Sequence, residues 1–108
     1  MDAIFKALAD DTRRQILDLL RERSGRTLGE LEDALAQGGS DMTRFGVMKH
    51  LKVLEAASLV VTRKQGRYKY HYLNALPLQE VMNRWIEPLV EKPLARAALN
   101  LKSKLEGK

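Results

Sequence analysis

The residues with the clearest chemical potential are basic side chains concentrated in one stretch of the chain. Between Thr43 and Tyr70 the sequence has seven lysines or arginines and one acid, Glu55, whereas the remaining 80 residues carry 12 basic and 13 acidic side chains. Guanidinium and ammonium groups bind phosphate oxygens, and a guanidinium also pairs with the edge of guanine. Charge confined in this way predicts a surface that meets a polyanion. The basic residues are Arg44, Lys49, Lys52, Arg63, Lys64, Arg67 and Lys69.

Side chains that could carry catalysis or hold a metal ion are few. The chain has no cysteine and only two histidines, His50 and His71, which are 21 positions apart. It contains no glycine-rich phosphate loop and no nucleophile elbow, and helix capping accounts for the adjacent acids Asp10 and Asp11. We therefore expect no catalytic residue, no metal site and no cofactor, and a protein that is not an enzyme.

Composition indicates one globular domain of modest size. The 108 residues are 44% hydrophobic and 31% charged, with a formal net charge of +5. No apolar run approaches the roughly 18 residues of a membrane span, and the N-terminus lacks the charged and apolar regions of a signal peptide. We expect a cytoplasmic protein with no membrane partner.

The elements that must position the basic residues begin with three helices. Apolar spacing at residues 4–8 predicts a short first helix, and the second runs over about residues 12–23. Thr27 and Glu30 have the spacing of a capping box, which opens the third helix.

The fourth predicted helix holds the first three basic residues of the cationic stretch. It follows a glycine-containing loop at residues 37–40 and reaches about Ala57. Val47, Leu51 and Leu54 share one face, which should pack on the preceding helices and leave the basic side chains outward. The third and fourth helices then form a helix-turn-helix. Three residues could cap the fourth helix: Ser40, Asp41 and Thr43.

A β-hairpin follows, with strands at residues 59–62 and 68–72 and a cationic tip between them. Gln65-Gly66 supplies the glycine that a two-residue hairpin turn favours. The three tyrosines of the second strand fall on one face, which we expect to hold the hairpin against the core.

The C-terminal part reads as a helical region with a wide apolar stripe. This stripe exceeds what a small domain needs to bury internally, so we assign it to a dimer interface. The predicted fold is mainly α with a two-stranded antiparallel β-wing, a winged helix-turn-helix. Residues 1–76 form its DNA-binding core, and residues 77–108 form a C-terminal helical dimerisation segment of the same domain. The stripe residues assigned to the interface are Val81, Met82, Trp85, Ile86 and Leu89.

Two segments, LADDTRRQILDLL and VMKHLKVLEAASLVVTRKQGRYKYHYLN, resemble an ArsR-type bacterial transcriptional repressor over about residues 3–74. TRFGVMKHLKVLE together with LQEVMNRWIEPL resembles a metal-independent branch of that family. The resemblance implies a homodimer held by the first and last helices, which adds Ile4, Phe5 and Leu8 to the interface. It also implies that the helix from Thr43 enters the major groove and that the wing tip touches phosphate or the minor groove.

Three positions depart from the family pattern. Met48 stands where many members have a serine, which removes one hydroxyl from the expected DNA face. Ser58 stands where they have glycine, so the end of the fourth helix must tolerate a side chain. Metal-sensing members carry a pair of cysteines in the third helix, where this chain reads LGELEDAL. The resemblance therefore implies no metal site of that type.

Two of the candidate DNA-binding residues have alternative roles. Thr43 could cap the helix alone or also contact DNA, and Phe45 could touch thymine methyls or pack on the third helix. His50 is near the apolar face and is better explained as a hydrogen-bonded structural residue than as a phosphate contact. The candidate DNA-binding residues are Thr43, Arg44, Phe45, Gly46, Lys49, Lys52, Arg63, Lys64, Gln65 and Arg67.

We predict a sequence-specific regulator of transcription, a repressor by resemblance, that binds double-stranded DNA as a homodimer. Two alternatives are a winged-helix module that binds an acidic protein and a nucleoid-type binder without sequence preference. Any small-molecule effector would have to shift the dimer between geometries with different half-site spacing.

Overall fold

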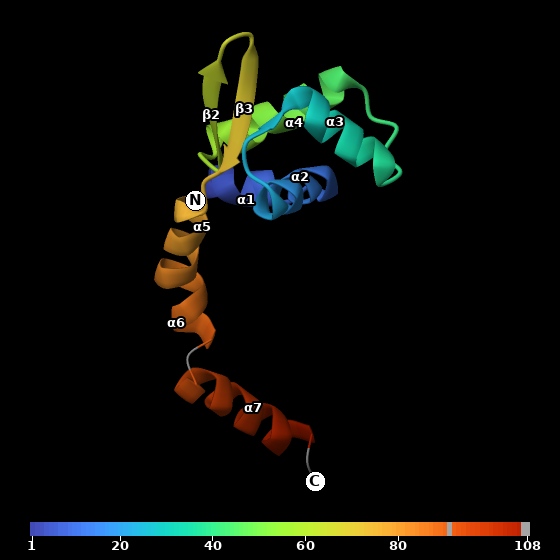
Figure 1. Cartoon of the computed structure of the whole chain (residues 1–108). Coiled ribbons are helices and arrows are strands. Elements are labelled where there is room, and N and C mark those ends of the chain that lie inside the picture. Colours follow the sequence, from blue (N-terminus) through green and yellow to red (C-terminus); the bar gives the residue numbers. More distant parts are fainter. Residues whose placement is uncertain (91, 107–108) are drawn as a thin grey trace. The chain divides into compact units, whose positions relative to one another are not determined.

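The computed structural model describes residues 1–90 and 92–106 (Figure 1). The chain divides into two compact units, Met1–Pro77 and Leu78–Lys108. In chain order the elements are α1 (Asp2–Leu8), α2 (Asp11–Glu22), β1 (Arg26–Thr27), α3 (Leu28–Gln37), α4 (Arg44–Ala56), β2 (Val60–Gln65), β3 (Tyr68–Leu73), α5 (Leu76–Val81), the π-helix η1 (Met82–Ile86), α6 (Glu87–Val90) and α7 (Lys92–Glu106).

The core of the first unit comes from aliphatic side chains of α2, α3, α4 and the start of β2. Each fully buried side chain of this kind contributes about 1.5–3 kcal/mol relative to an exposed one. The three buried positions predicted for α4 are confirmed as part of this core. The largest fully buried side chains are Ile16, Leu20, Leu31, Val47, Leu54 and Leu59.

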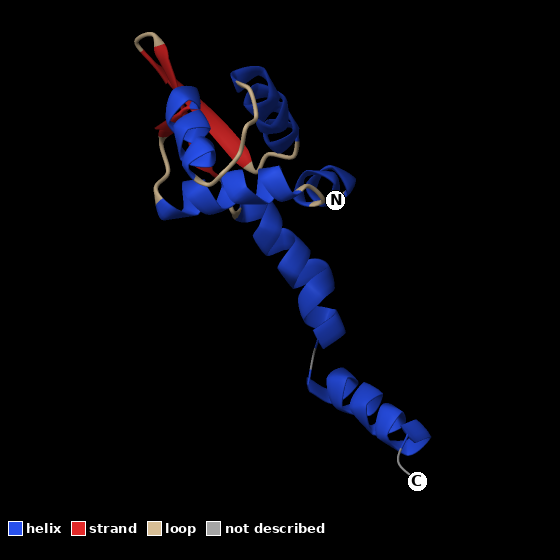
Figure 2. Cartoon of the chain, turned by 90° about the vertical axis from the view of Figure 1, so that its right-hand side faces the viewer, coloured by secondary structure: helices blue, strands red, loops and turns tan. Residues whose placement is uncertain are grey.

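The sheet has three antiparallel strands in the order β1-β3-β2. Strands are red in Figure 2. β2 and β3 form the predicted hairpin, from Val60 opposite Leu73 to Gln65 opposite Tyr68. The third strand, β1, pairs Arg26 with His71 and was not predicted. Two residues are too short to show a period-two pattern, so their pairing depends on the tertiary fold.

Side-chain caps begin the three longer helices of this unit. Asp10 accepts a hydrogen bond from the Arg13 backbone N–H, and Thr27 and Glu30 form the predicted capping box. Of the three candidate caps for α4, Thr43 is the one that caps, because its hydroxyl accepts from the Gly46 backbone N–H at 3.2 Å. α4 is thereby fixed to begin where the cationic stretch begins.

The C-terminal end of α4 uses a serine in a left-handed conformation. Ser58 has φ +59°, the Leu59 N–H donates to the Leu54 carbonyl at 3.0 Å, and the Ser58 N–H donates to the Glu55 carbonyl at 2.9 Å. This is a Schellman-type ending with serine where glycine is usual. The departure noted in the sequence is therefore accommodated without changing the backbone.

The second unit contains a local widening of its first helix. Between α5 and α6, residues Met82–Ile86 form a π-helical turn, in which the Glu87 N–H donates to the Met82 carbonyl. Pro88 has no N–H and its ring would crowd the Arg84 carbonyl in a regular α-helix. The distortion that Pro88 would cause in a regular α-helix is thus taken up by a π turn immediately before it. Within the described part of the chain, no helix is long and apolar enough to cross a membrane.

Candidate nucleic-acid interface

The basic side chains of α4 are held at the surface because the opposite face of the helix is buried. Val47, Leu51 and Leu54 are at most 3% exposed. Arg44, Lys49 and Lys52 are exposed, as the periodicity predicted. A helix anchored on one face and cationic on the other has the geometry needed to enter a groove of duplex DNA.

Phe45 and Gly46 lie at the first turn of α4. Phe45 is 71% exposed, so its ring is not packed in the core against α3. The outward position leaves the other alternative, contact with thymine methyl groups. Gly46 has a steric role, because an added Cβ would lie 2.6 Å from the Met42 Cγ. The glycine lets Met42 cover the start of the helix beside the Thr43 cap.

Among the described residues, two ion pairs of an arginine or a lysine connect α4 to neighbouring elements. The Arg44 Nε lies 2.9 Å from a carboxylate oxygen of Glu32 in α3, with the guanidinium side chain 62% exposed. The Lys69 Nζ of β3 lies 3.5 Å from Glu55 Oε1 near the end of α4. Both are surface pairs of small net energy, so a phosphate or a base edge can compete for either cation.

The wing tip carries the second group of candidate residues. All of its members from Arg63 to Arg67 are exposed. The two-residue loop is Gly66-Arg67, one position later than Gln65-Gly66, because Gln65 still pairs with Tyr68. Gly66 has φ +63°, as the first loop position of a type II′ turn requires. The Arg67 guanidinium lies 6.0 Å from the Tyr68 ring centroid.

The burial of the β3 side chains agrees only in part with the packing expected of its tyrosines. Tyr70 and Tyr72 are half-buried, but Tyr68 is 54% exposed, so the interpretation of Tyr68 as a packing residue is wrong. On the opposite face of the strand, His71 is 4% exposed. β1 pairs with β3 along its edge, and the Arg26 carbonyl of β1 accepts a hydrogen bond from the His71 Nδ1 at 2.9 Å. A buried polar ring satisfied in this way could not be inferred from alternation alone.

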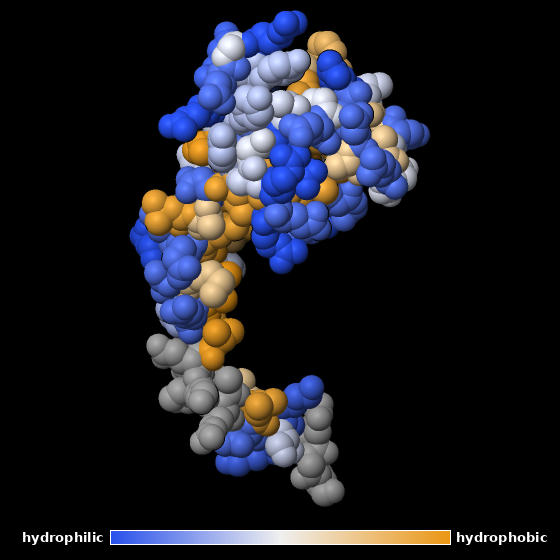
Figure 3. Space-filling view, viewed as in Figure 1, coloured by the Kyte–Doolittle hydropathy of each residue, from blue (hydrophilic) through white to orange (hydrophobic). Residues whose placement is uncertain are grey.

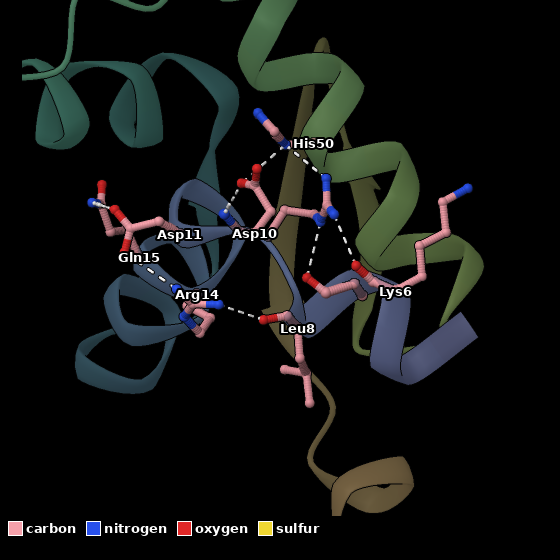
Figure 4. A network of polar contacts seen from close by, with 9 residues as sticks. Lys6, Leu8, Asp10, Asp11, Arg14, Gln15 and His50 are labelled. Carbon is pink, nitrogen blue, oxygen red and sulfur yellow. Dashed lines mark hydrogen bonds and ion pairs between the residues drawn. The ribbon is translucent and has the colours of Figure 1, made fainter. Parts of the chain in front are cut away.

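His50 takes part in a polar network at the joint of α1, α2 and α4 (Figure 4). The Arg13 guanidinium donates to the Lys6 carbonyl at 2.8 Å, to the Ala7 carbonyl at 2.9 Å and to the His50 Nδ1 at 3.2 Å. The Asp10 Oδ2 lies 3.6 Å from the same ring nitrogen. The structural interpretation of His50 is confirmed by these contacts.

Two carboxylates in the first unit have pKa values below their ordinary range. The backbone N–H of Arg13 donates to Asp10 and lowers the pKa of that carboxyl. For Glu30, the Thr27 backbone N–H and then the Arg23 guanidinium lower the pKa from 4.5 to about 2. The largest cause of both pKa shifts is a hydrogen bond of a helix cap, so the shifts concern stability rather than proton transfer.

The residues predicted for a dimer interface differ in exposure. Ile4 and Val81 are buried within the single chain and Leu8 is half-buried, whereas Phe5 is 38% exposed. The other four side chains are exposed, and hydrophobic residues are visible along α5 and α6 in Figure 3, in contrast to the hydrophilic wing. These four are Met82, Trp85, Ile86 and Leu89.

The helices, the turn between α3 and α4, and the wing together define a winged helix-turn-helix. A family model described as a helix-turn-helix domain matches residues 8–63. The uncharacterized HTH-type transcriptional regulator YuzN of Bacillus subtilis (strain 168) is 47% identical over 87 residues, which cover 80% of this chain and 95% of the relative. The transcriptional repressor SdpR of the same organism is 30% identical over 92 residues, covering 85% and 94%.

Solved structures agree with these relatives. The ArsR-like transcriptional regulator from Rhodococcus sp. RHA1 superposes with a TM-score of 0.74 at 25% identity, covering 95% of this chain and 89% of that one. The chain belongs to the ArsR family of helix-turn-helix transcriptional regulators. Proteins of this family bind DNA and are not enzymes, and within the described residues no group of three His, Asp or Glu side chains could hold a metal ion.

Proposed function

We propose that this regulator binds a pseudo-palindromic operator as a homodimer and represses transcription from it. The observation that carries the proposal is the first turn of α4, where Arg44 and the 71% exposed Phe45 stand outward beside Lys49. An exposed aromatic side chain is poorly suited to water but well suited to thymine methyl groups. Binding through phosphates alone would not need it.

Each part of the cationic surface has a distinct role in this proposal. Arg44 reads guanine through two parallel hydrogen bonds, for which it exchanges its ion pair with Glu32. Lys49 and Lys52 bind phosphates of the major groove, and the wing tip binds the adjacent backbone. In a two-fold symmetric dimer the two α4 helices would lie about 34–36 Å apart, one turn of duplex. Occupying a promoter would exclude polymerase from it, and the relative SdpR is named as a transcriptional repressor.

The test is binding to duplex fragments from upstream of the protein's own gene, compared with random duplex over a salt series. We expect a preference that persists at about 0.15 M salt. Arg44→Ala should remove about 1–3 kcal/mol of discrimination between sequences, whereas Lys64→Ala should weaken all sequences alike and lower the salt slope by about 1.

Arg21→Ala serves as the matched control, because Arg21 is an exposed basic residue of α2 outside the cationic surface. It should bind DNA like the parent chain. Equal affinity for every duplex, lost completely with salt, would instead support the nucleoid-type alternative. Unchanged binding in both Arg44→Ala and Lys64→Ala would show that another surface of the protein binds DNA.

A further inference from the structure

A small pocket lies where the start of α3, the middle of α4 and β3 meet. Its cavity volume is about 150 Å³, and its apolar lining consists of Leu28, Met48 and Leu51. A cavity of this volume accommodates a group the size of one benzene ring. Met48 is the position at which the sequence departs from the serine of many family members, so its thioether adds apolar surface in place of a hydroxyl.

The rim of the pocket is cationic. Lys52, Glu55 and Lys69 contribute to the lining and sum to a formal charge of +1. Lys69 is paired with Glu55 at 3.5 Å, whereas Lys52 takes part in none of the ion pairs formed by the described residues. One unneutralised ammonium beside an apolar cavity is complementary to a ligand with a single negative charge.

The remaining polar group of the lining is the buried His71. Its Nδ1 must carry a hydrogen, because its partner, the Arg26 carbonyl, can only accept. The Nε2 has no hydrogen bond to any described residue, and no buried side-chain nitrogen or oxygen among those residues lacks one. The Nε2 is therefore solvent-accessible on a ring that is 4% exposed and lines this pocket. In the neutral ring it is an acceptor for a ligand hydroxyl group.

We propose that this pocket binds a small hydroxy-aromatic monocarboxylate. The ring of the ligand packs on Leu28, Met48 and Leu51, and its carboxylate pairs with Lys52 and Lys69. Its hydroxyl group donates to the Nε2 of His71. Each feature of the ligand matches one property of the pocket: the ring matches its volume and apolar lining, the carboxylate its positive charge, and the hydroxyl group the accessible acceptor on His71.

The pocket joins the two parts of the cationic surface, which gives the ligand a regulatory consequence that rests on the proposed function. The Lys69–Glu55 pair is the only ion pair between α4 and β3 among the described residues. A ligand carboxylate beside Lys69 competes with Glu55 for the Lys69 ammonium group. It also neutralises Lys52, a candidate phosphate contact. Bound ligand therefore lowers affinity for DNA, since the ligand and the phosphates compete for the same cation.

The binding test is a nuclear magnetic resonance titration of the intact chain with 4-hydroxybenzoate, observing methionine methyl groups and histidine rings. We expect saturable shifts at Met48 and His71. The neutral 4-hydroxybenzamide should bind about tenfold more weakly, because it lacks the charge that Lys52 and Lys69 complement. Benzoate, which lacks the hydroxyl group, should also bind more weakly.

Variants locate the site. Lys69→Gln should weaken binding of 4-hydroxybenzoate about tenfold, whereas Lys49→Gln, on the exposed face of α4 outside the pocket, should leave it unchanged. Both positions are exposed, so neither substitution removes core packing. Shifts that do not saturate, equal binding of acid and amide, or no effect of Lys69→Gln would overturn the proposal.

Binding to DNA is measured separately, with and without saturating 4-hydroxybenzoate. We expect a several-fold loss of affinity for the preferred duplex. If the acid binds and DNA affinity stays the same, the regulatory consequence is wrong although the pocket is a ligand site. If no duplex is bound in the absence of acid, the proposed function fails, and the titration still decides whether the pocket binds the acid.

Discussion

At the scale of single residues, Ser58 shows how a sequence can depart from a family pattern at a cost in stability. Its left-handed backbone places a Cβ where a non-glycine residue is disfavoured by about 1–2 kcal/mol. Ser58→Gly removes that strain but adds freedom to the unfolded chain, so we expect a net gain of about 0.5–1 kcal/mol in the free energy of unfolding. Urea denaturation measures it. Ser58→Ala keeps the Cβ and should give no gain; an equal gain from both substitutions would contradict the explanation.

Glu30 gives a second prediction at this scale, a dependence of stability on pH. Its pKa falls from 4.5 to about 2 on folding, so its carboxylate contributes stability above about pH 4.5 that is lost as the pH falls toward 2. Glu30→Gln keeps an acceptor for the Thr27 N–H but does not titrate. The parent chain should therefore be more stable than the variant at pH 7, with the difference narrowing in acid. A difference that stays constant from pH 7 to pH 2 in urea denaturation would refute this assignment.

At the scale of elements, Arg13 fastens α1 to α2 and α4. Its guanidinium satisfies two terminal carbonyl groups of α1, Lys6 and Ala7, and reaches His50 of α4. Arg13→Met should lower the free energy of unfolding by about 2 kcal/mol, because two helix-terminal carbonyls and the His50 ring lose one shared charged donor. Arg14→Met is the control: it removes one exposed hydrogen bond to the Leu8 carbonyl and one exposed ion pair with Asp11, and it should cost less than about 1 kcal/mol. Equal losses of stability for the two variants in thermal or urea denaturation would contradict the role of Arg13 in linking α1 to α4.

Which elements could be predicted depended on whether their signals were local. The Thr27–Glu30 capping box and the buried face of α4 depend on spacing within one helix, and both were found from sequence. β1 could not be found, since two residues carry no periodicity, and without it the hydrogen-bond partner of the buried His71 could not be predicted. The exposure of Phe45 could not be predicted from the sequence either, because an aromatic side chain at the start of a helix can pack on the core or face a ligand.

At the scale of the whole molecule, the proposed dimer depends on apolar side chains that the single chain leaves exposed. Leu89 is 58% exposed and Met82 42% exposed on the helical stretch after the wing. A partner that covers such a stripe contributes about 25 cal/mol per Å² of apolar surface buried, so placing a charge there is strongly unfavourable. We therefore expect Leu89→Glu to convert a dimer into a monomer in sedimentation velocity experiments.

The same variant should also lose affinity for a two-half-site operator, because each half-site must then be bound by an independent monomer rather than by a linked pair. Its affinity for a single half-site should be unchanged, since Leu89 lies outside Met1–Pro77, the unit that holds α4 and the wing. Val61→Gln is the matched control, because Val61 is a 47% exposed apolar residue of the wing strand β2 and not of the stripe. It should leave the dimer intact. A Leu89→Glu chain that still sediments as a dimer would place the two-fold interface on another surface. A parent chain that sediments as a monomer would contradict the proposal that a homodimer binds a pseudo-palindromic operator.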